Sequence, residues 1–163
     1  MLEAKMQGAL NKQINAELYS SYLYLSMAAW FEAQTLKGFA HWMRVQAKEE
    51  HAHAMKFFDY VLERGAKVEL KAIDAPPKSW KNPLDAFKAV AAHEAKVTGM
   101  INALADQAQG IRDHATGTML HWFISEQVEE EANAAEVVAK LEMIGDSSGG
   151  LFALDHQLSK RGE

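Results

Sequence analysis

Apolar residues recur every three or four positions along most of this chain, which is the spacing of one buried face of an α-helix. The prolines Pro76, Pro77 and Pro83 fall in one short region, so the stretches on either side are free to form long helices. Gly65 and Gly145 stand where two of these stretches end, as expected of helix C-caps. The pattern predicts four long helices and a short fifth one, over residues 3–33, 37–64, 83–110, 113–144 and about 148–160.

Residues 65–82 connect the second and third helices and lack a helical pattern. Asn82 and Pro83 suit an N-cap and a first helical residue, so the third helix should begin there. The connector can span up to about 60 Å when extended, whereas a helix of 28 residues is about 42 Å long. It can therefore cross the whole bundle and make the second and third helices parallel. We expect an all-α fold with one domain over residues 1–163, in which a four-helix bundle of about 3–144 has one long crossover.

The composition restricts the kinds of site and partner that this chain can have. Hydrophobic residues make up 48% and charged residues 24% of the chain, as in an ordinary globular protein rather than a disordered one. Because there is no cysteine, disulfides and thiolate sites are excluded, and a metal ion would need oxygen or imidazole ligands. The formal net charge of −5 offers no broad basic surface to a nucleic acid. Since we find no signal peptide or membrane-spanning run, we expect a cytoplasmic protein with neither nucleic acid nor membrane as a partner.

Each of the four long helices carries a glutamate in its apolar stripe. Glu17, Glu50, Glu94 and Glu130 each lie seven residues from an apolar or aromatic residue on both sides, and so share a helix face with them. His53 follows Glu50 by three residues and lies on the same face. The pattern predicts four carboxylates and one imidazole inside the bundle.

The four glutamates also lie at a similar depth. Counted from the turn of its own hairpin, each one lies about 20 to 26 Å along its helix. Four ionised carboxylates in an apolar core would each cost several kcal/mol without a compensating charge. No Lys or Arg stands three, four or seven residues from any of them. Two divalent ions would supply the missing charge, with His53 as a neutral ligand, so the residues themselves indicate a dinuclear carboxylate site.

Simpler interpretations stay open at this stage. A single glutamate in a helical stripe is more often a surface residue whose position has been misjudged. Four at matching depth could also hold protons, or form salt bridges with residues of other helices. The spacing of Glu50 and His53 is a weak signal alone, and its weight comes from the other three glutamates.

Four motifs surround these residues: LNKQINAELYSSYLY at 10–24, Glu49-Glu50 followed by His53-Ala54-Met55, His93-Glu94, and WFISEQVEEE at 122–131. In this order, and over essentially the full length of the chain, they resemble the non-haem ferritins of bacteria and archaea. The resemblance implies a ferritin-like four-helix bundle that oxidises Fe²⁺ with O₂ and stores the product as a ferric oxyhydroxide mineral. It also implies a hollow homo-oligomeric shell of twenty-four subunits, and no haem.

The same resemblance assigns metal ligands residue by residue. It implies that Glu17, Glu50 and His53 hold a first ferroxidase iron, and that Glu50, Glu94 and Glu130 hold a second, with Gln127 nearby. A third iron position would use the remaining acids, which are Glu49, Glu126 and Glu129 together with Glu130. Without the resemblance, these flanking acids would be interpreted as solvated surface residues.

Two aromatic residues lie close to the predicted metal layer. Tyr24 is seven residues beyond Glu17, and the similar ferritins place there a tyrosine that donates a hydrogen bond or an electron; an ordinary core tyrosine is an equally good interpretation. We expect Trp122 to be a core residue. In the last helix, Leu151, Phe152, Leu154 and Leu158 form an apolar side that either packs around a symmetry axis of the shell or docks on its own bundle.

Related functions differ at identifiable residues. A haem-containing bacterioferritin should carry a second Glu-x-x-His, but Asn133 follows Glu130 by three residues. A rubrerythrin-like peroxidase should bring a cysteine-ligated module, which this chain lacks. A DNA-protecting mini-ferritin places its ligands between subunits, whereas all candidate ligands here fall in one bundle. A purely structural bundle would consume no O₂ when Fe²⁺ is added.

Overall fold

The computed structural model describes residues 2–162 and confirms the predicted all-α fold. The helices in this range are α1 (Ala4–Ala33), α2 (Lys37–Glu63), α3 (Pro83–Gly110), α4 (His114–Ile144) and α5 (Ser148–Leu158). Each begins and ends within two residues of its predicted limits. None of the helices in residues 2–162 combines the length and the apolar character that crossing a membrane requires.

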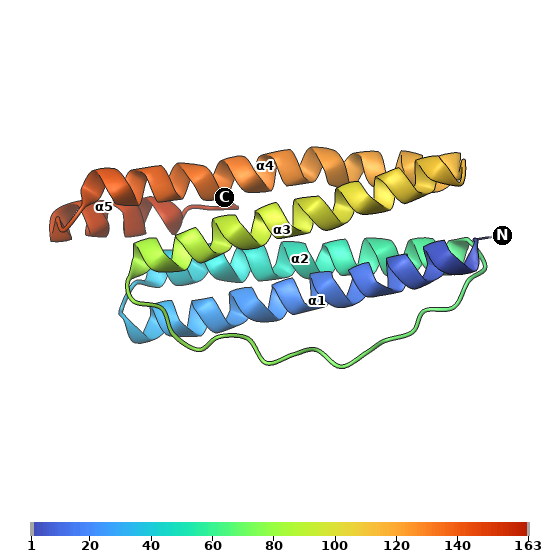
Figure 1. The fold of residues 1–163 in the computed structure, drawn as a ribbon. Helices are drawn as coiled ribbons and strands as arrows, with labels where there is room; N and C mark the ends of the chain where they lie inside the picture. The colour runs from blue at the N-terminus through green and yellow to red at the C-terminus, as the bar shows by residue number, and fades with distance from the viewer. Residues whose placement is uncertain (1, 163) are drawn as a thin grey trace.

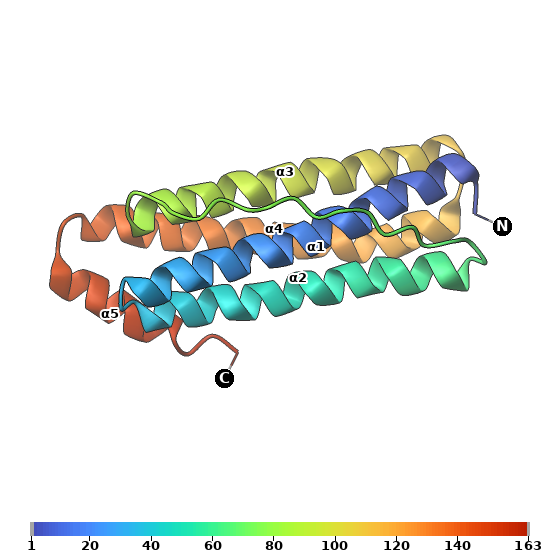
Figure 2. The same ribbon diagram turned by 90° about the horizontal axis from the view of Figure 1, so that it is seen from below.

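The four long helices form two antiparallel hairpins, α1 with α2 and α3 with α4 (Figure 1). The connector between α2 and α3 runs back along the length of the bundle beside α1, as both views show (Figures 1 and 2). It therefore returns the chain to the end where α2 began, and α2 and α3 are parallel, as its length predicted.

Polar side chains of α1 hold this extended connector through its backbone. Asn11 donates through Nδ2 to the Lys67 carbonyl at 3.0 Å and accepts through Oδ1 from the Glu69 amide at 3.0 Å. Further along, Ser26 Oγ donates to the Pro77 carbonyl at 2.6 Å. These bonds satisfy connector groups that have no partner within a helix or sheet, so the crossover lies along a fixed path.

Local chemistry sets the helix limits. Gly65, with φ of 69°, follows α2 in the left-handed region that favours glycine. Asn82 accepts from the Asp85 amide at 2.8 Å, with Pro83 as the first residue of α3. Asp113 accepts in the same way from the Thr116 amide at 3.2 Å and begins α4. Gly65 thus follows the end of α2, and Asn82 and Asp113 mark the beginnings of α3 and α4.

The apolar core is divided in two by a polar layer near its middle. One cluster contains Phe31, Phe39 and Phe87, and the other contains Phe57 and Phe123. Between them lie most of the buried polar residues of the four long helices, namely Gln13, Glu17, Ser20, Gln46, Glu50, His53, Glu94, Gln127 and Glu130. The two clusters supply the stability that lets the bundle carry so many polar groups in its interior.

Helix α5 packs across the beginning of α2 rather than standing free (Figure 2). Leu154 and Leu158 are buried in the larger apolar cluster, whereas Phe152 is 77% exposed. The apolar side of the last helix thus serves partly to dock on its own bundle, and it leaves one aromatic ring uncovered.

Candidate metal centre

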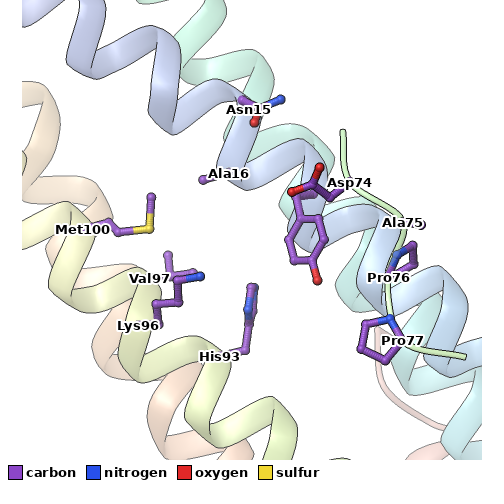
Figure 3. A pocket seen from close by; sticks show the side chains of 11 residues that line it. Asn15, Ala16, Asp74, Ala75, Pro76, Pro77, His93, Lys96, Val97 and Met100 are labelled. Carbon is purple, nitrogen blue, oxygen red and sulfur yellow. The ribbon is translucent and has the colours of Figure 1, made fainter. Parts of the chain in front are cut away.

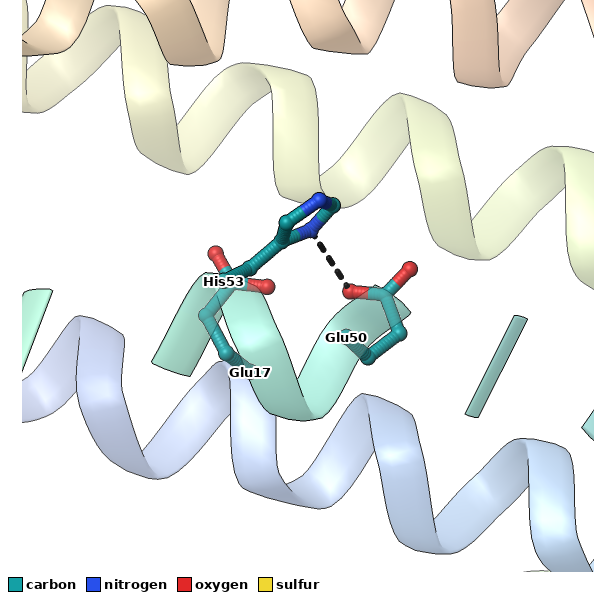
Figure 4. Close-up of side chains that lie close together, drawn as sticks. All are labelled: Glu17, Glu50 and His53. Atoms are coloured by element: carbon teal, nitrogen blue, oxygen red, sulfur yellow. Dashed lines mark ion pairs between the residues drawn. The ribbon is translucent and has the colours of Figure 1, made fainter. Parts of the chain in front are cut away.

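Glu17, Glu50 and His53 form a compact group of metal-binding atoms. Glu17 comes from α1 and the other two from adjacent turns of α2, and one ligand atom of each lies within 4.8 Å of the others. Figure 4 shows these side chains directed from α1 and α2 toward α3. His53 Nδ1 lies 3.4 Å from Glu50 Oε2. Their exposures are 5% or less, so the heptad pattern has placed polar groups in the core.

A second group shares the same imidazole. His53, Glu126 and Glu130 bring their ligand atoms within 4.8 Å of one another. His53 Nε2 lies 3.9 Å from Glu126 Oε1, on the side of the ring opposite Glu50. Glu126 is only partly buried, whereas Glu130 is 3% exposed. His53 therefore lies between a buried group and one that extends toward the surface.

Glu94 belongs to neither of these two groups in residues 2–162, but it is held in the same layer. Tyr24, which is fully buried, donates its phenol hydrogen to Glu94 Oε1. Gln127 donates through Nε2 to Glu94 Oε2 at 3.2 Å and to Thr98 Oγ1 at 3.3 Å. Tyr24 and Gln127 thus donate hydrogen bonds to an acid of the layer, in addition to packing in the core.

Two buried amides orient three of the acids, and neither amide was predicted from the sequence. Gln13 Nε2 donates to Glu17 Oε1 at 2.7 Å. Gln46 Nε2 donates at 2.8 Å to both Glu50 Oε1 and Glu130 Oε2, and so joins α2 to α4. Each glutamine precedes its glutamate by four residues in the same stripe, which is a signal that a search for partners at this spacing would find.

Burial raises the proton affinity of most of these carboxyl groups. Burial, followed by the charge of Glu50, raises the pKa of Glu17 well above its usual value. The same two causes raise the pKa of Glu94 to about 7 and that of Glu130 to about 8. The Glu94 charge contributes further to the Glu130 shift. Without a metal, Glu94 and Glu130 thus retain protons near neutral pH, and Glu17 holds its proton more strongly than an exposed glutamate does.

Glu50 and His53 behave in the opposite way because they stabilise each other. Burial alone would raise the pKa of Glu50, but the hydrogen bond and charge of His53 and the amide of Gln46 bring it below its usual value. Burial alone would lower the pKa of His53, but its contact with Glu50 and the charges of Glu50, Glu17 and Glu130 raise it to about 9. The metal-free layer therefore contains one ion pair among largely neutral acids.

The remaining predicted acids lie on the flank of the layer. Glu49 is half-buried and pairs with Arg161, whose Nη2 lies 2.5 Å from Glu49 Oε2. Burial raises the pKa of Glu49, and Arg161 opposes this effect. Glu129 is exposed and belongs to neither metal-binding group in the described range. The structure thus brings Glu126 to His53 and Glu130, and places an arginine rather than other acids on Glu49.

Trp122 is not the core residue that we expected. Its side chain is 40% exposed, with Lys56 Nζ 3.9 Å from the ring centroid and the His53 ring 5.4 Å away. The heptad position before Glu130 is taken by Phe123, which is buried, and the neighbouring residue is turned about 100° away from it. Trp122 covers one side of His53 instead of filling the core.

His93, which belongs to one of the sequence motifs, contacts a serine of α1. Its Nε2 lies 2.8 Å from Ser20 Oγ, and burial lowers its pKa. On its other side is a cavity of about 670 Å³ between α1, α3 and the connector. Figure 3 shows His93 and Lys96 of α3 beside this cavity, with Asp74 and Pro76 of the connector across it. His93 therefore lines the cavity and is held there by Ser20.

The donor set suits a hard cation. It consists of carboxylate oxygens and one imidazole, with no sulfur. Glu17 Oε2 is buried and has no hydrogen-bond partner among the described residues, although a buried carboxylate oxygen normally has one. A metal ion among Glu17, Glu50 and His53 would satisfy that oxygen.

Comparisons with known proteins agree with this architecture. A family model described as "Ferritin-like domain" matches residues 7–144. A bacterial non-heme ferritin of Bacteroides fragilis is 44% identical over 161 residues, which cover 99% of this chain and 100% of that protein. One from Staphylococcus aureus strain MRSA252 is 37% identical, with 99% and 97% covered. The solved structure of an open pore ferritin from Archaeoglobus fulgidus superposes with a TM-score of 0.98 at 52% identity, covering 99% of each chain. The chain therefore belongs to the non-haem ferritin family.

Proposed function

We propose that this protein stores iron by oxidising Fe²⁺ with O₂ inside each subunit and retaining the ferric product within a hollow shell. The observation that carries this proposal is the layer itself. Four helices of one subunit bury four carboxylates and a histidine at one depth, and this layer lies between two intact apolar clusters. A bundle that needed only stability would fill these positions with apolar residues.

The first Fe²⁺ is bound as substrate by Glu17, Glu50 and His53, whose donor atoms already lie close together. The second is bound by Glu50, Glu94 and Glu130. Glu50 bridges the two positions because Glu17 and His53 lie on one side of it, while Gln46 links it to Glu130 on the other. Carboxylate oxygens stabilise Fe³⁺ more strongly than Fe²⁺, so this donor set favours oxidation.

The protein's own residues prepare the layer for binding and oxidising Fe²⁺. Each Fe²⁺ gives one electron to O₂, so a pair of ions delivers two electrons in one event. Glu17, Glu94, Glu130 and His53 give up their protons as the ions bind, which keeps the net charge of the layer low. Tyr24 holds one oxygen of Glu94 through its phenol, and it is placed to donate a hydrogen bond or an electron to the layer.

Oxidised iron leaves toward the flank. His53, Glu126 and Glu130 form the neighbouring group. The third position that the family resemblance implies would add Glu49, which pairs with Arg161 in this structure, and Glu129, which is exposed. The loose grouping of partly buried acids there suits a transit site, since few ligands hold the ion tightly. From this position the ferric product passes to a ferric oxyhydroxide mineral.

A mineral store requires an enclosed volume that one bundle does not have. We propose a homo-oligomeric shell of twenty-four subunits, located in the cytoplasm and without haem. Exposed apolar side chains support an oligomer, since Met143 is 87%, Phe152 77% and Leu70 66% exposed in the single chain. These residues lie on different elements, as expected when each subunit contacts several neighbours.

Aerobic addition of Fe²⁺ tests the proposal. Glu50→Ala and His53→Ala should slow the appearance of Fe³⁺ absorbance and the consumption of O₂ by at least tenfold, and leave the particle size by light scattering unchanged. His51→Ala is the matched control, because His51 lies on the same helix but is exposed. Unchanged rates in both site variants would show that the layer is not the oxidation site.

A further inference from the structure

The segment after α5 returns along α2 and reaches the acid layer. Asp155 of α5 accepts from the backbone amides of Gly38 at 2.8 Å and Phe39 at 3.0 Å, and so caps the first turn of α2. Beyond α5, the Arg161 carbonyl lies 2.9 Å from His41 Nε2. The C-terminal segment is thus attached to α2 through Asp155 and through the Arg161 carbonyl, in addition to any contact of the Arg161 side chain.

The guanidinium of Arg161 is inserted between two residues of α2. Its Nη2 donates to Gln46 Oε1 at 2.7 Å and to Glu49 Oε2 at 2.5 Å. Its Cζ lies 4.1 Å from the centroid of the Trp42 ring, a distance suited to a cation–π contact. Only 18% of the side chain is exposed. Arg161 is therefore fixed on several sides and is no mobile terminal residue.

The contact with Gln46 determines which way a buried amide faces. Gln46 is fully buried, and both of its Nε2 hydrogens are used, one on Glu50 and one on Glu130. Reversing the amide would point its oxygen at two carboxyl groups and its NH₂ group at a guanidinium. Arg161 therefore prevents the reversal, since in the reversed orientation the NH₂ group would face the guanidinium, donor against donor, and the oxygen would face the ionised Glu50 carboxylate.

We propose that Arg161 is a positioning residue of the metal centre, which acts through Gln46 to hold Glu50 and Glu130 ready to share one metal ion. The inference rests on the proposed function, because it takes these two carboxylates as ligands of the second ion. Partners that orient metal ligands typically change affinity by about 10-fold to 100-fold when removed. Since Arg161 acts one residue further out, we expect its loss to weaken the second ion roughly tenfold and the first ion much less.

Titration of the complete, iron-free protein with Co²⁺ under argon tests this, because the visible bands of Co²⁺ report on its ligands. Arg161→Met keeps most of the side-chain length and removes the donor, and it should weaken the second Co²⁺ roughly tenfold. Arg161→Lys restores a donor and should recover part of the loss. Lys160→Ala removes the same charge from an exposed neighbour and should bind like the wild type. An unchanged Co²⁺ affinity in Arg161→Met, or an equal loss in Lys160→Ala, would overturn the proposal.

A double variant tests the route through the amide. Gln46→Met should weaken the second Co²⁺ by itself, and adding Arg161→Met should cause no further loss if the arginine acts through Gln46. Additive losses would overturn the proposal and indicate a route through Glu49. The proposed function is judged separately, by whether the wild type binds a pair of Co²⁺ ions that Glu50→Ala fails to bind. If the wild type binds the pair and Arg161→Met leaves the Co²⁺ affinity unchanged, only the positioning role of Arg161 is refuted.

Discussion

Binding of a metal pair should release protons, because the metal-free layer stores them. At pH 7, pKa values of about 9 for His53 and about 8 for Glu130 leave both groups almost fully protonated, and a value of about 7 leaves Glu94 half protonated. All three must lose their protons to bind a metal ion. Together they should release roughly two and a half protons per subunit, and Glu17, whose pKa is also raised by burial, should add to this number.

The sign of the pH dependence follows from the same values. As pH rises from 7 to 9, Glu94 and Glu130 ionise before the metal arrives. At pH 9, Glu94, Glu130 and His53 together should therefore release only roughly half a proton. Metal affinity should rise over this interval, because fewer protons compete. With unperturbed pKa values the same ligands would release only roughly a quarter of a proton at pH 7, all of it from the histidine.

Calorimetric titration with Co²⁺ in two buffers of different ionisation enthalpy counts these protons directly. The heats measured in the two buffers differ by the number of protons released, multiplied by the difference in ionisation enthalpy. His51→Ala should match the wild type, because that histidine is exposed and outside the layer. A release of less than one proton at pH 7, or a number that does not change between pH 7 and 9, would refute the reasoning.

Three further changes test separate parts of the structure. Tyr24→Phe removes a hydrogen bond that lowers the pKa of Glu94, so the second Co²⁺ should bind more weakly at pH 7 and recover by pH 9, and an unchanged pH profile would contradict this. Gly38→Ala would place a methyl group 1.7 Å from the Asp155 carbonyl oxygen, so α5 should detach and the C-terminal segment should become sensitive to protease. Gly8→Ala is the control, because its methyl group meets no atom within 4 Å and the change should be neutral or slightly stabilising. Phe57→Ala should lower the free energy of unfolding by about 3 to 5 kcal/mol in denaturant titrations, and a loss below about 1 kcal/mol would contradict its place in the core.

The fold could be predicted from the sequence because two independent constraints agree. The helical period located the long helices, and Asn82, Pro83 and Gly65 marked the limits of the connector. The length of the connector then allowed α2 and α3 to be parallel, since it is long enough to return to the start of α2. The bonds from Asn11 and Ser26 to the connector were not predictable in this way, because they depend on which face of the bundle it follows.

The metal centre could be predicted from the sequence as far as its residues follow the helical period. Glu17, Glu50, Glu94 and Glu130 are buried because each replaces an apolar residue in a stripe, and their depth follows from the rise of the helix. Arg161 was not predictable, because it reaches the layer from outside the four long helices. Periodicity restricts contacts within a helix and between neighbouring ones, and it does not determine the path of a tail that leaves the bundle and returns.

The electrostatics also change the original argument for a metal. The absence of nearby Lys and Arg suggested that divalent ions must balance four buried carboxylates. The raised pKa values of Glu17, Glu94 and Glu130 indicate that protons perform this role in the metal-free chain, and Glu50 is balanced by protonated His53. The bundle can therefore fold before any metal arrives. Metal binding is then an exchange of protons for cations, and the reverse exchange, when the product leaves, returns the layer to a state that is already stable. A centre that passes its product on needs this property, because a fold that depended on bound metal would retain it.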